Sequence, residues 1–372
     1  MILRHLPGNP GQKHNRVFQD YTEAILQRMR VLILGSVKEY AIERFYIQYL
    51  KEWGAEVTCY ASADKVDEHR SRNLLNRILF RIGINKGYTA VNNEMLTLAR
   101  DLKPDIIWVF KGMEILPDTL KKIRRGNLKL VNYNPDHPFI FSGKGSGNTN
   151  VTQSVGLYDL HFCYHEGLRQ QIAGRYQLPA VYLPFAFDLS IDGFEKATLH
   201  PERKKICFIG NPDRFRVDTI LMLSRAGFEI DIYGHGWQRT KLALNINIGI
   251  YDAVYGQEFW NKLRQYRVQL NIFRKHNLGS HNMRSFEVPA VGGIQLTPFS
   301  EEQAGFFEEN KEVFFYRHTG ELEDKCRYLL DLPDREANAI REAARRRSAT
   351  SGYTYRDRGL LVYNTFKNAL GW

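Results

Sequence analysis

The stretch MRVLILGS at Met29–Ser36 is a short apolar run that ends in a Gly-Ser turn. Residues 42–53 follow with apolar side chains at helical spacing, and a second apolar run, EVTCYA, occupies Glu56–Ala61. A strand that reads as one continuous apolar run is typical of a parallel sheet with both faces covered, and the strand–helix–strand order supports this arrangement. The first part of the chain is therefore predicted to be an α/β domain.

A second alternating series begins with KICFIGN at Lys205–Asn211 and continues through VQLNIF at Val268–Phe273. Two consecutive series predict an α/β protein with two Rossmann-like, doubly wound domains that face a cleft. Ligands of such sheets bind beyond the carboxyl ends of the strands. The chain is predicted to divide into an N-terminal domain at residues 1–188, of which 1–28 are an extension, and a C-terminal domain at residues 189–355. A terminal helix follows at residues 356–372.

Composition limits the possible functions. The 372 residues exceed the usual size of one core, and the net charge of +11 suits a phosphorylated ligand or an anionic surface. The chain has no RNA-recognition signature and no zinc-finger spacing, which disfavours nucleic acid as a partner. Four widely spaced cysteines favour buried free thiols and a cytoplasmic location. The N-terminus lacks a signal-like apolar segment, and no apolar run reaches the ~18 residues that a membrane span needs.

The segment NLGSHNMRSFEVPAVGGIQLT at Asn277–Thr297 carries the most chemistry. Ser280 is a candidate N-cap, and the amides of a helix that starts there suit a diphosphate. Arg284 and Glu287 share a helix face, and a carboxylate two turns into the helix can accept both hydroxyls of a ribose. The pair Gly292 and Gly293 then ends the helix and lets backbone approach a ligand. The alternative interpretation is a surface helix with a salt-bridged glutamate and a glycine turn.

Further nucleotide-binding candidates follow the strands of the second series: Gly210, Asn211 and Arg214 after the first strand, Tyr233 and Gly234 at the second, and Arg274 after VQLNIF. Arg216 and Lys275 are basic neighbours of Arg214 and Arg274, and the diphosphate is assigned to Arg214, Arg274 and Arg284. A glycine permits close approach of backbone to ligand, and an arginine fork matches phosphate oxygens, which favours Arg274 over Lys275. A tyrosine ring can contact a nucleotide base edge-on or by stacking. The alternatives are tight turns and solvated arginines.

In the first series, NPDHP at Asn134–Pro138 ends a buried strand on the cleft side. Asp136 or His137 can serve as a general base there, and the alternative is a turn in which Asp136 caps backbone amides. Gly35 and Ser36 are expected to line the cleft. No dinucleotide fingerprint follows the first strand, and the loop GKGSGNT lacks the flanking elements of a phosphate loop. No Asp-x-Asp segment follows a strand of this series, so neither a metal nor a cofactor is expected.

The pattern RSFEVPAVGG at Arg284–Gly293 resembles the signature of group 1 glycosyltransferases with two facing Rossmann-like domains, the GT-B architecture. More narrowly, it resembles the spore-maturation (CgeB-type) branch. Other segments agree in order and spacing: PDIIWVFKG, NPDHP, CFIGNPDRFR, IYGHGW and FFYRHTGELEDKCRYLL. The resemblance covers most of residues 30–365. It implies an acceptor-side N-terminal domain, a nucleotide-sugar-binding domain at 189–355, and a terminal helix that crosses back to the N-terminal domain.

The resemblance implies transfer of a sugar from a nucleotide-diphosphate donor, with UDP first, to a hydroxyl acceptor such as a glycan. Many retaining members carry a glutamate eight residues before the ribose-binding one, where this chain has Gly279, so the donor sugar and the stereochemical outcome stay open. One alternative is a sugar-nucleotide epimerase of the same architecture, and another is a non-catalytic glycan- or nucleic-acid-binding protein. The basic segment Arg341–Arg347 is interpreted as a solvated helix face, with peripheral contact to an anionic membrane as the alternative.

Overall fold

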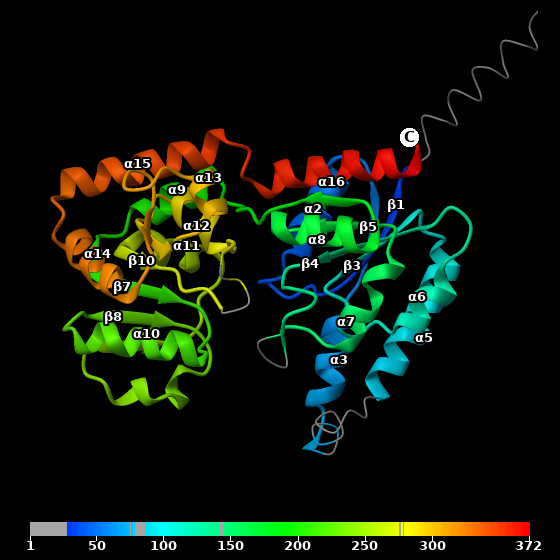
Figure 1. The fold of residues 1–372 in the computed structure, drawn as a ribbon, viewed down its shortest axis with the longest axis horizontal. Helices are drawn as coiled ribbons and strands as arrows, with labels where there is room; N and C mark the ends of the chain where they lie inside the picture. Colours follow the sequence, from blue (N-terminus) through cyan, green and yellow to red (C-terminus); the bar gives the residue numbers. More distant parts are fainter. Residues whose placement is uncertain are drawn as a thin grey trace, which may run out of the picture.

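The computed structural model describes residues 28–74, 76, 78, 86–141, 145–274, 277 and 279–372. Two six-stranded sheets form two lobes that lie side by side (Figure 1). The first sheet has the order β2-β1-β3-β4-β5-β6 and the second β12-β11-β10-β7-β8-β9, and every neighbouring pair is parallel. The predicted α/β fold with two doubly wound sheets is confirmed.

The N-terminal lobe contains β1 (Arg30–Leu34), α2 (Glu43–Glu52), β2 (Glu56–Tyr60), α3 (Ser62–Ser71), α5 (Lys86–Leu102), β3 (Ile106–Phe110), α6 (Pro117–Ile123), β4 (Lys129–Asn134), α7 (Thr149–Ser154), a 3-10 turn at Val155–Leu157, β5 (Leu160–Cys163), α8 (Glu166–Tyr176) and β6 (Ala180–Tyr182). β1, β3 and β4 are almost wholly buried, as expected for strands with helices on both faces. The chain order reverses between β1 and β3, which makes the carboxyl ends of these two strands the predicted binding crevice of this lobe.

The C-terminal lobe contains α9 (Ile191–Thr198), β7 (Arg203–Ile209), α10 (Arg214–Arg225), β8 (Ile230–Tyr233), 3-10 turns at Trp237–Arg239 and Lys241–Leu244, β9 (Ile248–Tyr251), α11 (Gly256–Gln265), β10 (Tyr266–Leu270), α12 (Arg284–Ala290), β11 (Gln295–Pro298), α13 (Glu301–Phe306), β12 (Phe314–Tyr316), α14 (Thr319–Asp331) and α15 (Asp334–Thr350). α9 packs on α11, so the chain has joined this lobe by residue 191. Here the order reverses between β7 and β10.

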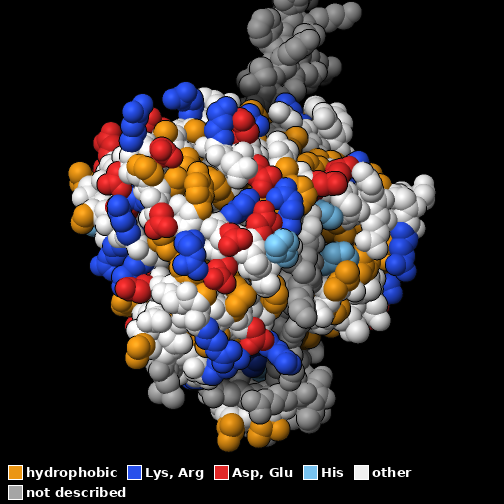
Figure 2. Space-filling model, turned by 60° about the vertical axis from the view of Figure 1, so that its left-hand side comes forward, with side chains coloured by type: hydrophobic (Ala, Val, Ile, Leu, Met, Phe, Trp, Pro, Cys, Tyr) orange, Lys and Arg blue, Asp and Glu red, His pale blue; other side chains and the backbone are white. Residues whose placement is uncertain are grey.

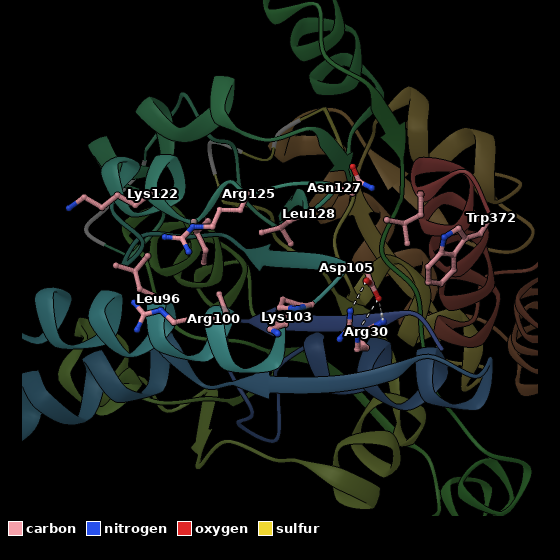
Figure 3. Close-up of a pocket in the computed structure, with 14 residues that line it drawn as sticks. Arg30, Leu96, Arg100, Lys103, Asp105, Lys122, Arg125, Asn127, Leu128 and Trp372 are labelled. Carbon is pink, nitrogen blue, oxygen red and sulfur yellow. Dashed lines mark hydrogen bonds and ion pairs between the residues drawn. The ribbon is translucent and has the colours of Figure 1, made fainter. Parts of the chain in front are cut away.

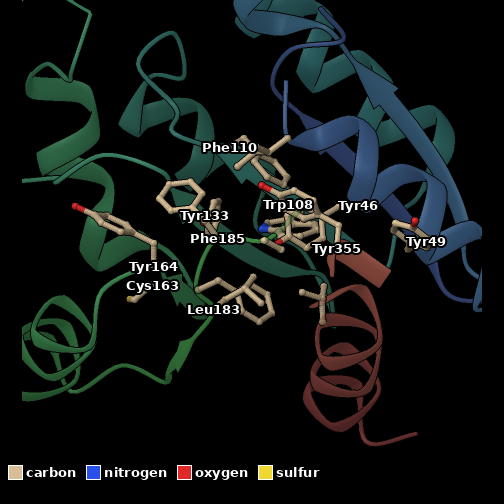
Figure 4. Packing of buried hydrophobic residues seen from close by; sticks show 14 of the residues in the cluster. Tyr46, Tyr49, Trp108, Phe110, Tyr133, Cys163, Tyr164, Leu183, Phe185 and Tyr355 are labelled. Carbon is tan, nitrogen blue, oxygen red and sulfur yellow. The ribbon is translucent and has the colours of Figure 1, made fainter. Parts of the chain in front are cut away.

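The last helix, α16 (Tyr355–Leu370), packs against α2 of the N-terminal lobe (Figure 1). A capping box at Thr354 fixes its start, and Gly359 meets α2 so closely that an added Cβ would lie 2.7 Å from the Cβ of Tyr49. Its Phe366 ring contacts Trp108 of β3 edge-on at 5.3 Å. Figure 4 shows the aromatic core in which Trp108 lies beside Tyr46 and Tyr355.

Candidate functional site

Loops at the carboxyl ends of both sheets meet between the lobes. The Tyr164 hydroxyl, after β5, donates to Asn277 Oδ1 at 3.0 Å, and the Phe185 amide donates to His281 Nε2 at 3.2 Å. Near β1, the ring of Tyr40 stacks on Tyr255 with centroids 6.2 Å apart. Because ligands of doubly wound sheets bind at this edge, the residues that follow β3, β4, β7 and β10 form the candidate site.

Helix α12 supplies a buried ion pair on the C-terminal side of the site. Arg284 NH1 contacts Glu287 Oε2, and Glu287 is only 6% exposed. Burial raises the pKa of Glu287, while the Arg284 guanidinium opposes that rise. The guanidinium also lies over the Phe259 ring at 4.3 Å. The predicted sharing of one helix face is confirmed, and the glutamate is held as an acceptor beside a cation.

Three arginines gather at the strand reversal between β7 and β10. Arg216 donates from Nε and NH2 to the Ile272 carbonyl at 3.0 and 2.9 Å, and from NH1 to the Asn211 carbonyl at 2.9 Å. Burial, together with repulsion from Arg274 and Arg284, lowers the pKa of Arg216 to about 10, and Asp213 partly offsets this. The positive charge that the three arginines bring together suits a diphosphate.

Lys111 and Asp136 form the N-terminal side of the site, at the carboxyl ends of β3 and β4. Lys111 Nζ contacts Asp136 Oδ2 at 2.6 Å, and both side chains are mostly buried. The Asp136 amide donates to Asn134 Oδ1 at 3.0 Å, which ties the loop to the end of β4. Lys111 has a positive φ of 59°, a conformation that non-glycine residues adopt at a cost and that is common at functional sites.

Gly35 and Ser36 lie after β1, where buried acids hold their loop. The Ser36 amide donates to Glu43 Oε1 at 2.9 Å, and the Ser36 hydroxyl donates to Asp64 Oδ1 at 2.7 Å. An added Cβ on Gly35 would lie 2.5 Å from Glu43 Oε1, so the glycine is required by this packing. Burial raises the pKa of Glu43 to about 7.

Ser280 does not begin a helix, so that prediction is wrong. α12 starts at Arg284, and its N-cap position, Met283, has no side-chain cap. Ser280 is buried instead, and its hydroxyl donates to Glu302 Oε2 at 3.1 Å, beside the hydrogen bond between Glu302 Oε2 and His281 Nδ1 at 2.9 Å. Burial lowers the pKa of His281. Ser280 is therefore held by Glu302, whose Oε1 accepts from the Glu166 amide of the N-terminal lobe at 2.7 Å, and it does not present helix amides to a ligand.

The predicted ligand-facing role of Tyr233 and Gly234 is also wrong. Tyr233 is 4% exposed, stacks on Tyr251 with centroids 4.9 Å apart, and bonds Tyr266 through its hydroxyl at 2.8 Å. An added Cβ on Gly234, whose φ is 157°, would lie 2.3 Å from the Gly210 carbonyl oxygen. Gly234 thus serves backbone packing against Gly210.

Gly292 and Gly293 are buried and approach their own chain, which corrects their predicted approach to a ligand. An added Cβ on Gly293 would lie 2.7 Å from the Leu263 carbonyl oxygen, and the Gly292 carbonyl accepts a hydrogen bond from Arg341 NH1 at 2.9 Å. Their conformational freedom is used to pack α12 against α11 and α15. They shape the end of the helix that carries Arg284 without lining the site.

The side chains of the remaining predicted site residues differ in exposure and in their hydrogen-bond partners. Arg214 is almost fully exposed, with Asp218 at 3.8 Å, and Arg216 is the cation that turns inward. The Asn211 side chain accepts from the His235 amide at 3.0 Å. His137 Nδ1 accepts from the Phe139 amide at 3.2 Å, which leaves Asp136 as the better candidate base. Lys275 and residues 143–144 of the GKGSGNT loop lie outside the described residues.

Sequence reasoning missed Lys111, although a signal was present. A lysine followed by glycine directly after the apolar run IIWVF marks the carboxyl end of a strand. It also selected Arg214 as the diphosphate-binding arginine, whereas the structure exposes Arg214 and turns Arg216 inward, although both follow the same glycine turn. Asp213 caps α10 by accepting from the Arg216 amide, and this cap fixes which arginine faces inward.

The basic segment Arg341–Arg347 is largely built into the fold. Arg341 is 3% exposed and bonds Glu202 and three backbone carbonyls, while Arg347 Nε donates to the Phe306 carbonyl at 2.8 Å. Over most of the face in Figure 2, Lys and Arg side chains are interspersed with Asp and Glu. Within the described residues, no cluster of His, Cys, Asp and Glu has the arrangement of a metal site, and no helix is both long and apolar enough to cross a bilayer.

Residues 214–361 match the family model described as "Glycosyl transferase-like". This matched segment carries the arginine cluster and Glu287, so the likeness to glycosyltransferases covers the C-terminal side of the candidate site. No curated protein sequence matches the chain.

Solved structures share the two-lobed architecture. Sucrose-phosphate synthase from Thermosynechococcus elongatus matches with a TM-score of 0.69 at 9% identity, over 92% of this chain and all of the other. Anabaena HepE in complex with UDP-glucose matches with a TM-score of 0.62 at 12% identity, over 92% of this chain and all of the other. UDP-GlcNAc 2-epimerase from Neisseria meningitidis bound to UDP-GlcNAc matches with a TM-score of 0.57 at 14% identity, over 91% of this chain and all of the other. These likenesses establish the GT-B fold.

Proposed function

We propose that this enzyme transfers a sugar from a nucleoside-diphosphate sugar, with UDP as the first candidate, to a hydroxyl of a glycan or similar acceptor without an essential metal. The observation that carries the proposal is the arginine cluster Arg216, Arg274 and Arg284 beside the Glu287 carboxylate. A cation cluster next to a buried acceptor is the arrangement that a diphosphate joined to a ribose requires. The family match of residues 214–361 and the likeness to HepE with UDP-glucose support it.

In this proposal, Glu287 accepts hydrogen bonds from the ribose hydroxyls, and the arginines hold the diphosphate. The acceptor oxygen attacks the anomeric carbon, and Asp136 takes its proton. The bond between that carbon and the diphosphate oxygen breaks, and the nucleoside diphosphate leaves with the electron pair. Lys111 orients Asp136, and the fixed arginine charges stabilise the leaving group.

The proposal extends to the family branch and the cellular location of the protein. The pattern at Arg284–Gly293 supports placing the chain in the spore-maturation (CgeB-type) branch. The four cysteines are free, and three are buried, which supports a reducing, cytoplasmic location. The arginines of α15 offer little support for a membrane contact through that helix, because Arg341 is buried.

A thermal-shift screen of nucleotide sugars tests the proposal first, because a ligand that binds only the folded state raises the melting temperature. The donor that gives the largest shift is then incubated with glycan acceptors, and release of the free nucleoside diphosphate is followed together with the mass of the product. Glu258→Gln on α11, whose side chain pairs with Lys262 at 2.8 Å, is the control for substitutions at Glu287. The proposal fails if no nucleotide or nucleotide sugar shifts the melting temperature.

The epimerase of the same architecture is the second candidate, favoured by the likeness to UDP-GlcNAc 2-epimerase. An epimerase converts its nucleotide sugar with no acceptor present, whereas a transferase requires the acceptor hydroxyl. Proton NMR of the stabilising donor incubated alone with the enzyme separates the two. A new sugar configuration on an intact nucleotide identifies the epimerase, and an unchanged donor that is consumed only after acceptor is added identifies the transferase.

A further inference from the structure

A cavity of about 770 Å³ opens at the amino ends of the N-terminal sheet, on the side away from the candidate site. Asp105 at its wall precedes β3, and Lys111 of the candidate site follows β3. Six residues of extended chain place the two ends roughly 20 Å apart. The cavity is therefore separate from the region where the two lobes meet.

Five cations line this cavity against one carboxylate (Figure 3). Asp105 is already engaged by Arg30, through Oδ1 to NH2 at 3.1 Å and through Oδ2 to the backbone amide at 2.8 Å. The remaining cations come from two segments that Figure 3 shows on different sides of the pocket: Arg100 and Lys103 at the end of α5, and Lys122 and Arg125 at the end of α6.

Within the described part of the chain, none of these four cations has an ion pair, and all four are exposed. Their neighbours behave differently, because Lys121 pairs with Asp118 at 3.1 Å and Arg124 pairs with Asp159 at 2.8 Å. At the ends of α5 and α6, the cations that line the cavity are therefore the ones without an ion pair within the described residues.

The ends of α5 and α6 account for only part of this charge. Each helix carboxyl end carries about half a negative charge, so the two ends offset about one of the four positive charges. The end of α16 at Leu370 also lines the pocket and offsets roughly half a charge more, so by this count the pocket keeps a net charge of about +2 to +3. Its remaining walls include Leu96, Leu128, Leu370 and the half-exposed Trp372 ring. Such a lining fits a multiply charged anion joined to an apolar group.

We propose that this pocket, at the ends of α5 and α6, is a second anion site that binds a phosphate-bearing ligand. Lys122 and Arg125 contact the phosphate from one side and Arg100 and Lys103 from the other, and Trp372 covers the apolar part. The ligand chemistry is a phosphate ester or polyphosphate, and its source is either a free phosphorylated molecule or the headgroup of an anionic lipid. The site acts independently of the sugar transfer proposed for the region between the lobes.

The test compares Lys122→Ala/Arg125→Ala with Arg225→Ala/Arg335→Ala, which removes two exposed positive charges from the C-terminal lobe. The full chain is titrated with inorganic tripolyphosphate by calorimetry, and hydrogen exchange maps the protected peptides. In a second arm, the chain is sedimented with vesicles of phosphatidylglycerol or of phosphatidylcholine. All four side chains are exposed, so both variants are expected to keep the melting temperature of the parent.

We expect slower exchange over residues 96–105 and 121–128, and roughly thirty-fold weaker binding in the pocket variant, since each Lys or Arg near an anionic group contributes about one kcal/mol. The control variant should bind within two-fold of the parent (roughly the scatter of a surface substitution). Protection by tripolyphosphate assigns a free ligand. Sedimentation with phosphatidylglycerol alone, lost in the pocket variant, assigns a lipid headgroup. The proposal is overturned if neither probe engages these peptides, or if both variants lose binding equally.

Discussion

Replacing Glu287 by glutamine separates a ribose-binding carboxylate from one that only neutralises Arg284. The side chain keeps its shape and loses its charge. Because burial raises the pKa of Glu287, its ionised form is costly in the fold, and the amide removes this cost while weakening the contact with Arg284. The two effects oppose each other, so the melting temperature should change by no more than a few degrees (roughly 1 kcal/mol).

The effect on ligand binding is larger and has a definite sign. A hydrogen bond to a charged group contributes about 1.5–3 kcal/mol, so UDP should bind Glu287→Gln roughly 10- to 150-fold more weakly. The same substitution leaves Arg284 without its negative partner, which strengthens its attraction for a diphosphate. UDP that lacks both ribose hydroxyls should therefore bind the variant as tightly as the parent or more tightly.

Calorimetry measures the binding of both nucleotides to the parent, to Glu287→Gln and to the control Glu258→Gln. The two nucleotides and the two proteins, parent and Glu287→Gln, form a double-mutant-type cycle that isolates the contact between the carboxylate and the ribose. If UDP and its dideoxy form both bind Glu287→Gln more tightly than the parent, Glu287 is merely the counter-charge of Arg284. In that case the proposed ribose contact is wrong, although the arginine cluster can still hold a diphosphate.

Four further predictions follow from other parts of the structure. Glu43→Gln should raise the free energy of unfolding at pH 8 and leave it unchanged at pH 4. The fold raises the pKa of Glu43 from 4.5 to about 7, so the parent protein loses up to about 3 kcal/mol of stability as the pH rises through this window. Urea unfolding at several pH values measures this difference. Lys111→Met should lower kcat roughly 10- to 100-fold with little change in donor affinity, and an equal loss of donor affinity would count against its acceptor-side role. Arg341→Ala should cost about 3–5 kcal/mol in urea unfolding, because the buried Arg341 side chain is lost and Glu202 and three carbonyls lose their donor. Arg346→Ala, at an exposed position, should cost under about 0.5 kcal/mol. Arg274→Ala should raise the melting temperature of the free protein by roughly 2 °C while abolishing most of the shift that UDP produces, and scanning fluorimetry with and without UDP measures both.

The central strands were predictable because their burial leaves a mark in composition. β3 reads IIWVF and β7 contains ICFI, with no polar residue to obscure the pattern. The edge strand β9 at Ile248–Tyr251 escaped prediction, because its four residues are half-buried or exposed and include a glycine. Continuous apolar runs reveal strands that are covered on both faces, and a short, partly exposed strand such as β9 carries no such signal.

In the candidate site, contacts between residues close in sequence were predictable, and contacts between residues far apart in sequence were not. Arg284 and Glu287 were predictable as partners because helix geometry places residues three apart on one face. Ser280 was misassigned because its partner, Glu302, lies 22 residues further along the chain. The pairing of Lys111 with Asp136 likewise depends on β3 and β4 lying side by side, which the sequence of either strand alone does not reveal.

The arginine cluster explains why binding and stability should oppose each other at this site. Arg216 is buried near Arg274 and Arg284, and the mutual repulsion that lowers its pKa is a cost to the free protein. Glu287 pairs with Arg284 and Asp213 lies 3.5 Å from Arg216, whereas within the described residues Arg274 has no ion pair. In the proposed function a diphosphate supplies the missing negative charge, and the repulsion would become attraction when it binds. The unpaired Arg274 and the repulsion on Arg216 work against the stability of the free protein, and this cost is the physical reason for proposing an anionic ligand here.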